Sequence, residues 1–355
     1  MNSLRRRLGP ALLLLILSGA AVRAWDYEGH RLVNQIALAS LPTNFPAFVL
    51  TAEGRERVAF LAGEPDRWRN TTDLSLKHFN GLDHYMDLED LTDAGLNLMA
   101  LPQFRFDFAI LLSRTRAAHP EHFLPIKEEK DADHTRAQVG FLPWAIVENE
   151  AKLKSGFSYL QELQQAGTPG EVANAQQNIL YVMGVMGHYV GDGSQPLHTT
   201  KHHHGWVGPN PNGYSTNFSI HTWIDGGYIG QFGITFEKLR ARVRLAKMIS
   251  PEEFKGGSTN LFPAAMAYLI EQHQQLEPLY KLEKAGKLSG RRERDEEGYE
   301  FICQQLLRGG QMLGDLWLTA WQAAGPDTFL RSSLAKRKLA EENGGKRPPK
   351  KSRQP

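Results

Sequence analysis

The chain has 355 residues, of which 41% are hydrophobic and 23% charged, and its formal net charge is +2. This composition excludes a fibrous or largely disordered protein. The balanced charge argues against a nucleic-acid coat or a protein that covers a membrane surface. Cys303 is the single cysteine, so an intramolecular disulfide is excluded as well.

The first 24 residues have the pattern of a secretory signal peptide. Arginines at 5–7 precede an apolar run over 11–17, and small residues follow up to Ala24. The apolar run is shorter than the roughly 20 residues that a membrane-spanning helix needs. The sequence therefore predicts cleavage after Ala24, a mature chain that begins at Trp25, and a secreted or periplasmic protein without stable membrane insertion.

From Trp25 to Trp321 the hydrophobic pattern is helical almost throughout. Apolar residues recur at spacings of three and four over 32–41, 104–112, 139–163, 172–190, 236–248, 261–282 and 301–321. Gly and Pro clusters at 169–170, 205–213 and 256–257 separate these segments. We find no strand series and no internal repeat. We expect one all-α domain, a single-domain helical bundle over residues 25–331.

Residues 332–355 lose this periodicity. The end of the chain is rich in lysine and arginine, with Pro348 and Pro349 among them. Such a composition predicts a disordered basic tail. Nothing in the sequence indicates an obligate protein partner.

The most informative motif, GHYVGDGSQPLH, closes the helical segment 172–190. His188 and Asp192 are four residues apart, so a helix places both side chains on one face. Pro196 is expected to end the helix and to turn His198 back toward the pair.

A second pair, His221 and Asp225, repeats the four-residue spacing. A single pair favours a surface salt bridge, but two pairs with a linking histidine favour a metal centre, and imidazole with carboxylate favours zinc. The run 202–204 is three histidines in a loop rich in Gly and Pro, which we interpret as a solvated or opportunistic metal-binding stretch outside the site. Four further histidines have no spaced carboxylate partner in a helical frame and are expected to be surface or core residues: His78, His119, His122 and His134.

These motifs resemble the superfamily of zinc-dependent phospholipases C and single-strand nucleases of the S-one/P-one type. Its members are all-helical, hold three zinc ions, and bind one of them through the amine and carbonyl oxygen of a mature N-terminal Trp. Trp25 and His30, in WDYEGH, match the start of the family pattern. Asp66 and Arg69 match its Asp-x-x-Arg motif, and His84 matches the histidine that heads an aromatic and acidic stretch.

The resemblance implies three ligand sets. The first zinc would be held by Asp66, His84, His188 and Asp192. The second would be held by Trp25, His30 and again Asp192, and the third by His198, His221 and Asp225. Two zinc ions that share a carboxylate can lower the pKa of water toward neutrality and hold it in line with a phosphorus atom. The resemblance thus implies hydrolysis of phosphoric esters.

The substrate is predicted from four residues near the ligands. Asp66, Arg69 and Asp87 are expected to be catalytic, with Arg69 contacting phosphate. Tyr85 is expected to stack on a base, a contact worth roughly 1–3 kcal/mol. These residues, with the absence of an added membrane-binding domain, favour an endonuclease that cuts single-stranded DNA or RNA to 5′-phosphorylated products.

Two alternatives stay open. The first is a zinc-dependent phospholipase C acting on phospholipid, and the second is a non-catalytic metal-binding protein. The sequence GWVGPN after His204 replaces the Gly-Gly-Asn segment usual in the family, so the chain departs from the pattern close to the substrate side of the site.

Overall fold

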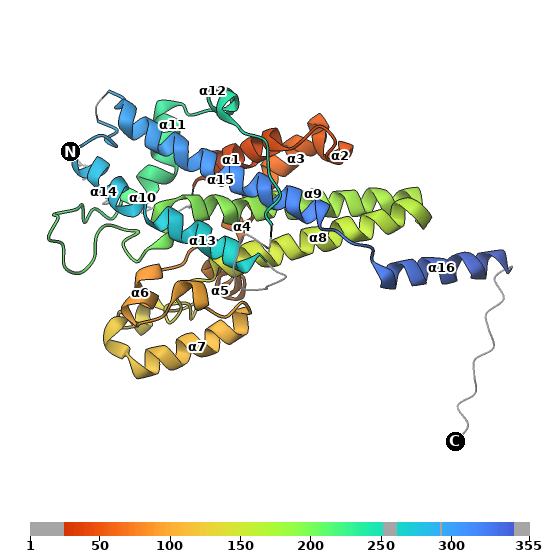
Figure 1. Cartoon of the computed structure of the whole chain (residues 1–355). Coiled ribbons are helices and arrows are strands. Elements are labelled where there is room, and N and C mark those ends of the chain that lie inside the picture. The colour runs from red at the N-terminus through yellow and green to blue at the C-terminus, as the bar shows by residue number, and fades with distance from the viewer. Residues whose placement is uncertain (1–24, 251–260, 292, 344–355) are drawn as a thin grey trace, which may run out of the picture.

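The computed structural model describes residues 25–250, 261–291 and 293–343 (Figure 1). The predicted signal peptide and the end of the predicted tail, 344–355, lie outside the described residues. The described residues form helices and contain no strand, so the all-α prediction is confirmed. None of the helices that they form is both long and apolar enough to cross a membrane.

The longer helices are α1 (Tyr27–Ser40), α3 (Ala52–Leu61), α5 (Leu74–Gly81), α7 (Arg105–Ala118), α8 (Leu142–Ala166), α9 (Pro169–Ser194), α13 (Phe262–His273), α14 (Leu276–Lys284), α15 (Glu296–Gln322) and α16 (Thr328–Glu342). Shorter helices are α2 (Ala47–Leu50), α4 (Glu64–Arg69), α6 (Leu88–Asp93), α10 (Ile220–Thr222), α11 (Tyr228–Phe232) and α12 (Phe236–Leu239). Single turns are η1 (Leu82–His84), η2 (Leu98–Ala100), η3 (Pro120–His122), η4 (Glu128–Lys130), η5 (Pro196–Thr199), η6 (Trp223–Gly227) and η7 (Arg240–Arg242).

Helix α9 is the centre of the bundle. It packs against α1, α3, α8 and α15, and Figure 1 shows α8, α9 and α15 running side by side along the molecule. Its start is fixed by a capping box, in which Thr168 and Glu171 each bond the other's backbone N–H. The apolar stripes of these helices meet in a core that includes Trp144, Phe157 and Trp317, each at most 2% exposed. This core holds the C-terminal turns of α9 in place.

Helices α1 and α15 approach especially closely. A Cβ atom at Gly310 would lie 2.3 Å from Cγ2 of Ile36, so only glycine permits this contact. The consequence is that α1 is pressed onto both α15 and α9, which fixes the side chains on its first turn.

The helix predicted over 236–248 is wrong beyond its first residues. The structure has only α12 and η7 there, and the chain then runs extended along α15. The backbone N–H of Ala246 donates to Ser40 O at 2.8 Å, and that of Lys247 donates to Asp315 Oδ1 at 2.7 Å. Because neighbouring helices satisfy these groups, the segment does not need helical hydrogen bonds of its own.

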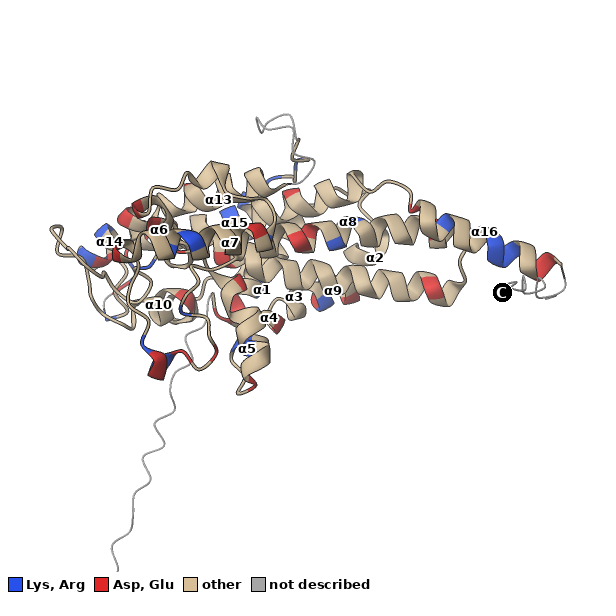
Figure 2. Ribbon diagram, turned by 90° about the horizontal axis from the view of Figure 1, so that it is seen from below, with Lys and Arg blue, Asp and Glu red and all other residues tan. Residues whose placement is uncertain are grey.

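The predicted boundary at 331/332 is also wrong, because α16 continues through Glu342. Leu334 is 5% exposed, and Arg331 and Arg337 form ion pairs with Glu162 on α8 and Glu171 on α9. These contacts tie a helix of low hydrophobic content to the bundle. Figure 2 shows α16 at one end of the molecule, carrying basic side chains.

Candidate metal centre

The candidate metal centre lies where the last turns of α9 pack against the first turn of α1. His188 and Asp192 are fully buried one helical turn apart on α9. His30 comes from α1, and its ring stacks on that of His188 with 3.7 Å between centroids. A Cβ atom at Gly191 would lie 2.8 Å from Nδ1 of His30, so the glycine permits this approach. The structure therefore brings the predicted helical pair and the predicted N-terminal histidine together.

Asp192 lies between imidazoles on both sides of its carboxylate. Its Oδ1 is 3.5 Å from Nε2 of His30 and 3.6 Å from Nδ1 of His198. Its Oδ2 is 3.0 Å from Nδ1 of His84 and 3.4 Å from Nε2 of His188. Because Nδ1 of His198 donates to the carbonyl oxygen of His84, the nitrogens open to cations are that of His30 on the Oδ1 side and those of His84 and His188 on the Oδ2 side. This arrangement is expected of a carboxylate shared by two cations.

The potential metal ligands on the Oδ2 side of Asp192 come from α4, η1 and α9. Nε2 of His188 is 2.9 Å from Nδ1 of His84 and 3.9 Å from Oδ1 of Asp66. Nδ1 of His188 lies 2.7 Å from the carbonyl oxygen of Ala62, which can only accept a hydrogen bond. Nδ1 therefore carries the proton, and Nε2 presents its lone pair to Asp66 and His84.

The third predicted set gathers on η5, α10 and η6, of which η6 is a π-helical turn. The Nε2 atoms of His198 and His221 face one another at 2.9 Å, and Asp225 Oδ2 lies 3.2 Å from His221 Nε2. Nδ1 of His198 donates to the carbonyl oxygen of His84 at 2.6 Å, which directs its other nitrogen to His221. Gln195 donates to Asp225 Oδ1 and fixes that carboxylate.

The buried nitrogen and oxygen atoms of the site are suited to bind metal because many of them have no hydrogen-bond partner within the protein. Among the described residues, these buried atoms have no hydrogen-bond partner: both ring nitrogens of His30, Nε2 of His84, Oδ1 of Asp192, Nδ1 of His221 and Oδ2 of Asp225. Buried polar atoms without partners are costly in a folded protein. Divalent cations at the sites would satisfy Oδ1 of Asp192, Oδ2 of Asp225 and one ring nitrogen of His30.

The protonation states agree with this interpretation. Burial, as the largest cause, lowers the pKa of His30, His84, His198 and His221, and it lowers that of His188 to about 3. Burial also raises the pKa of Asp192 and Asp225 well above the ordinary range. Neutral imidazoles are the form that binds metal, and a cation would lower the carboxyl pKa values again. The donor set of imidazole and carboxylate fits zinc.

Trp25 is buried against the same turn of α9. Its indole Nε1 donates to Ser194 Oγ at 3.0 Å, and Ser194 lies two residues after Asp192. The hydrogen bond thus holds the Trp25 ring beside the candidate metal centre. The role predicted for the amine and carbonyl oxygen of Trp25 stays a prediction.

Arg69 and Asp66 form an ion pair, with Nε to Oδ1 at 3.0 Å. The positive charge of Arg69 is, after burial, the main cause that lowers the pKa of His84 and His198, which places the guanidinium near both ligand sets. Asp87 is buried among acids: burial, then the charges of Asp90 and Glu89, raise its pKa. The predicted orienting role of Asp87 toward Arg69 stays a prediction.

Tyr85, the predicted base-stacking residue, is half-buried and packs against the hydrophobic core. Burial raises the pKa of its hydroxyl above the ordinary value. Little of its ring is therefore open to a stacking partner, and its role in substrate binding also stays a prediction.

The histidine run over 202–204 lies closer to the site than expected. The ring of His204 is 5.3 Å from that of His221, and the ring of His203 is 5.9 Å from it. His204 also stacks on Phe218, whose side chain is 66% exposed. The expectation of a solvated stretch is wrong for all three histidines, because His202 is 6% exposed and His203 and His204 are half-buried. No spacing rule could have found them, because the long loop over 200–219 returns them to the metal centre.

A further group of potential ligands, His119, Glu121 and His122, lies on and beside η3. All three side chains are exposed, with His119 at 52% and His122 at 38%. The group shares no residue with the buried ligand sets, and the expectation of surface histidines is confirmed here.

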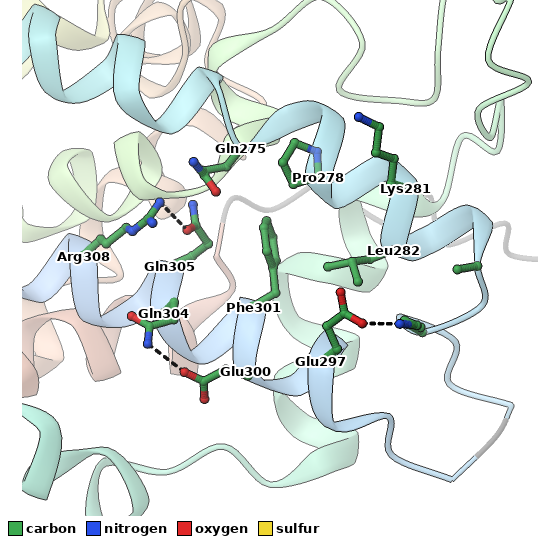
Figure 3. Close-up of a pocket in the computed structure, with 12 residues that line it drawn as sticks. Gln275, Pro278, Lys281, Leu282, Glu297, Glu300, Phe301, Gln304, Gln305 and Arg308 are labelled. Atoms are coloured by element: carbon green, nitrogen blue, oxygen red, sulfur yellow. Dashed lines mark hydrogen bonds and ion pairs between the residues drawn. The ribbon is translucent and has the colours of Figure 1, made fainter.

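A cavity of about 510 Å³ in the described part of the chain lies elsewhere, between α14 and α15 (Figure 3). Phe301, Pro278 and Leu282 are apolar lining residues, and Arg308 and Gln305 lie together at one end of the cavity. No histidine or aspartate lines it. It is therefore separate from the metal centre.

No known protein family and no curated protein sequence matches the chain. Among solved structures, the alpha toxin of Clostridium absonum matches with a TM-score of 0.45 and 11% identity, over 86% of this chain and 68% of the toxin. The Clostridium perfringens alpha-toxin from an avian strain matches with a TM-score of 0.35 and 13% identity, over 86% of this chain and 67% of the toxin. Similarity at this level assigns no role to any residue of this chain. The interpretation of the site therefore depends on the distances between its own side chains.

Proposed function

We propose that the chain is a zinc-dependent phosphodiesterase with three metal ions. The observation that carries the proposal is the buried carboxylate of Asp192, which faces imidazole nitrogens on each of its two oxygens. A second buried cluster, with His198 and His221, lies beside it. Two adjoining cation sites and a third nearby are a suitable frame for a displacement at phosphorus.

The residues of the chain would position the ions and the phosphate. Asp192 would be shared by two ions, while the hydrogen bond from Gln195 holds Asp225 toward the third. Zinc, when bound, supplies Lewis acidity and lowers the pKa of water. Arg69, fixed by its Nε contact to Asp66, would contact a non-bridging phosphate oxygen and offset the charge that grows in the transition state.

For the substrate, the site supports a phospholipid headgroup ester first. The nuclease prediction used Tyr85 as a base-stacking residue together with Asp66, Arg69, Asp87 and the single-domain layout, and Tyr85 is half-buried. The segment between α5 and η4 carries many exposed apolar side chains, which suit a lipid surface better than a nucleic acid.

Single-stranded DNA or RNA is the second candidate. It is supported by Phe218, an exposed aromatic ring that stacks on His204 next to the third ligand set. Such a platform could accept a base without regard to sequence.

The experiment uses processed protein loaded with zinc. Hydrolysis of bis(p-nitrophenyl) phosphate that is abolished by chelator and restored by zinc is the expected result. Zinc-loaded protein that leaves this ester intact would identify the chain as a non-catalytic metal-binding protein. Parallel assays with phosphatidylcholine vesicles and with denatured DNA and RNA then separate the two substrates.

A further inference from the structure

The cavity between α14 and α15 has the size and the mixed lining of a small-molecule site (Figure 3). Its volume of about 510 Å³ lies within the roughly 300–1,000 Å³ that is typical of ligand pockets. Phe301, Pro278 and Leu282 give it apolar lining, and charged side chains line it as well. The nature of a ligand can therefore be inferred from the charges.

All but one of the charged residues that line this cavity are neutralised by a partner. Three ion pairs account for them: Lys281–Glu277, Lys287–Glu297 and Glu300–Arg242. The exception is Arg308, which forms no ion pair with any residue that the structure describes. Its printed contacts are to the oxygens of two side-chain amides. The cavity thus carries one positive charge without a counter-charge.

Neutral groups hold the guanidinium of Arg308 at one end of the cavity. Its Nη1 donates to Oε1 of Gln305 at 3.2 Å and to Oε1 of Gln272 at 3.5 Å. Gln305 is 1% exposed, and its Nε2 donates to the carbonyl oxygen of Ser194 at 2.9 Å. Figure 3 shows Arg308 joined to Gln305 beside the apolar lining residues. Because these contacts use only Nη1, the N–H groups of Nε and Nη2 are available to a ligand.

We propose that this cavity binds a small amphipathic carboxylate, with its carboxylate on Nε and Nη2 of Arg308 and its apolar chain along Phe301 and Leu282. Nε and Nη2 form the side of the guanidinium that matches the two oxygens of a carboxylate. Arg331 binds the carboxylate of Glu162 through the same two atoms, at 2.9 and 2.7 Å. The proposal goes beyond the proposed function and does not depend on it, since the cavity shares no residue with the metal centre.

The charge balance favours a monoanion over phosphate. One carboxylate neutralises one unpaired guanidinium, whereas a dianion would add a further negative charge to a cavity that Glu297 and Glu300 also line. Arg308 also lines a second cavity of about 300 Å³, together with Arg242 and Arg244. Inorganic phosphate seated in that second cavity is the competing occupant.

The test is isothermal titration calorimetry of processed, zinc-loaded protein with octanoate. We expect one octanoate to bind per chain. Butyrate and octanol should each bind on the order of tenfold more weakly, because butyrate has a shorter apolar chain and octanol lacks the charge. Inorganic phosphate should bind more weakly than octanoate.

Two variants test the residues of the cavity. Arg308→Gln should weaken octanoate binding on the order of tenfold, because the charge-assisted hydrogen bonds are lost. Ala285→Glu places a carboxylate at an exposed lining position and should weaken binding as well. The matched control is Arg57→Gln, which removes the same charge from an exposed position on α3 and should bind as the parent does. Zinc content and thermal melting confirm that each variant is folded.

Four results would overturn the proposal. The first is a parent protein that does not bind octanoate, and the second is octanol that binds as tightly as octanoate. The third is an Arg308→Gln protein with the affinity of the parent, which would place the carboxylate elsewhere, for example on the zinc ions. The fourth is inorganic phosphate that binds more tightly than octanoate, which would assign Arg308 to the second cavity.

Discussion

Replacement of Asp192 by asparagine should remove two of the three zinc ions. Asparagine has nearly the same size, but it lacks the charge that faces His30 on one side and His84 and His188 on the other. The buried ligand set would lose the one group that both neighbouring sites share. The third set, around His221, keeps all of its ligands.

The stability change can be estimated from linkage. An ion present at 1,000 times its dissociation constant stabilises the native state by about 4.1 kcal/mol. Loss of two such ions costs about 8 kcal/mol, which at roughly 2–4 °C per kcal/mol corresponds to a melting temperature lower by roughly 15–30 °C. In chelator the destabilisation caused by Asp192→Asn should disappear or reverse. Burial raises the pKa of Asp192, and a buried carboxylate without a cation is unfavourable at neutral pH.

Zinc analysis and thermal melting with and without EDTA measure both effects. The control is Glu162→Gln, a buried carboxylate paired with Arg331 at the far end of the bundle, which should keep every zinc ion. An Asp192→Asn protein with the zinc content and melting temperature of the parent would refute the shared-carboxylate reasoning.

Three further predictions concern other parts of the chain. A tag placed before Trp25, or retention of residues 1–24, should lower the zinc content by one ion, and full zinc occupancy measured in such a protein would contradict the role of the mature N-terminus. Arg69→Lys should keep its zinc but lower kcat for a soluble phosphodiester on the order of 100-fold, since lysine lacks the planar fork that contacts phosphate; an unchanged kcat would exclude Arg69 from catalysis. Hydrogen bonds from Arg337 and then Thr168 lower the pKa of Glu171 to about 2, so its contribution to stability is present above pH 4.5 and is lost as the pH falls toward 2. Glu171→Gln should therefore flatten the acid limb of the stability curve in urea titrations, and an identical curve would show that this carboxylate does not stabilise the fold.

The helical ligand pairs could be predicted because their signal is local. His188 and Asp192 lie four residues apart in a helix with clear apolar periodicity, and the structure keeps both features. The same argument applies to His221 and Asp225, although a π-helical turn carries the second pair. Where four-residue spacing decides the geometry, sequence reasoning is sufficient.

Other features depend on contacts between distant segments. No spacing in the sequence indicates that His203 and His204 lie beside His221. Helix α16 has too little apolar character for its docking to be predicted without Glu162 and Glu171 on the neighbouring helices. Periodicity predicted α7 but could not tell which of its apolar residues would face the core. Packing of Phe108 on Trp144 decides this, and it leaves the opposite side exposed.

The most direct test of the central claim is an anomalous difference map, recorded at the zinc edge, from crystals of processed protein. We predict two neighbouring peaks beside Asp192 and a third between His198, His221 and Asp225. A map without peaks at these residues, or with zinc only at the exposed group of His119 and His122, would contradict the metal centre and the phosphodiesterase activity that depends on it.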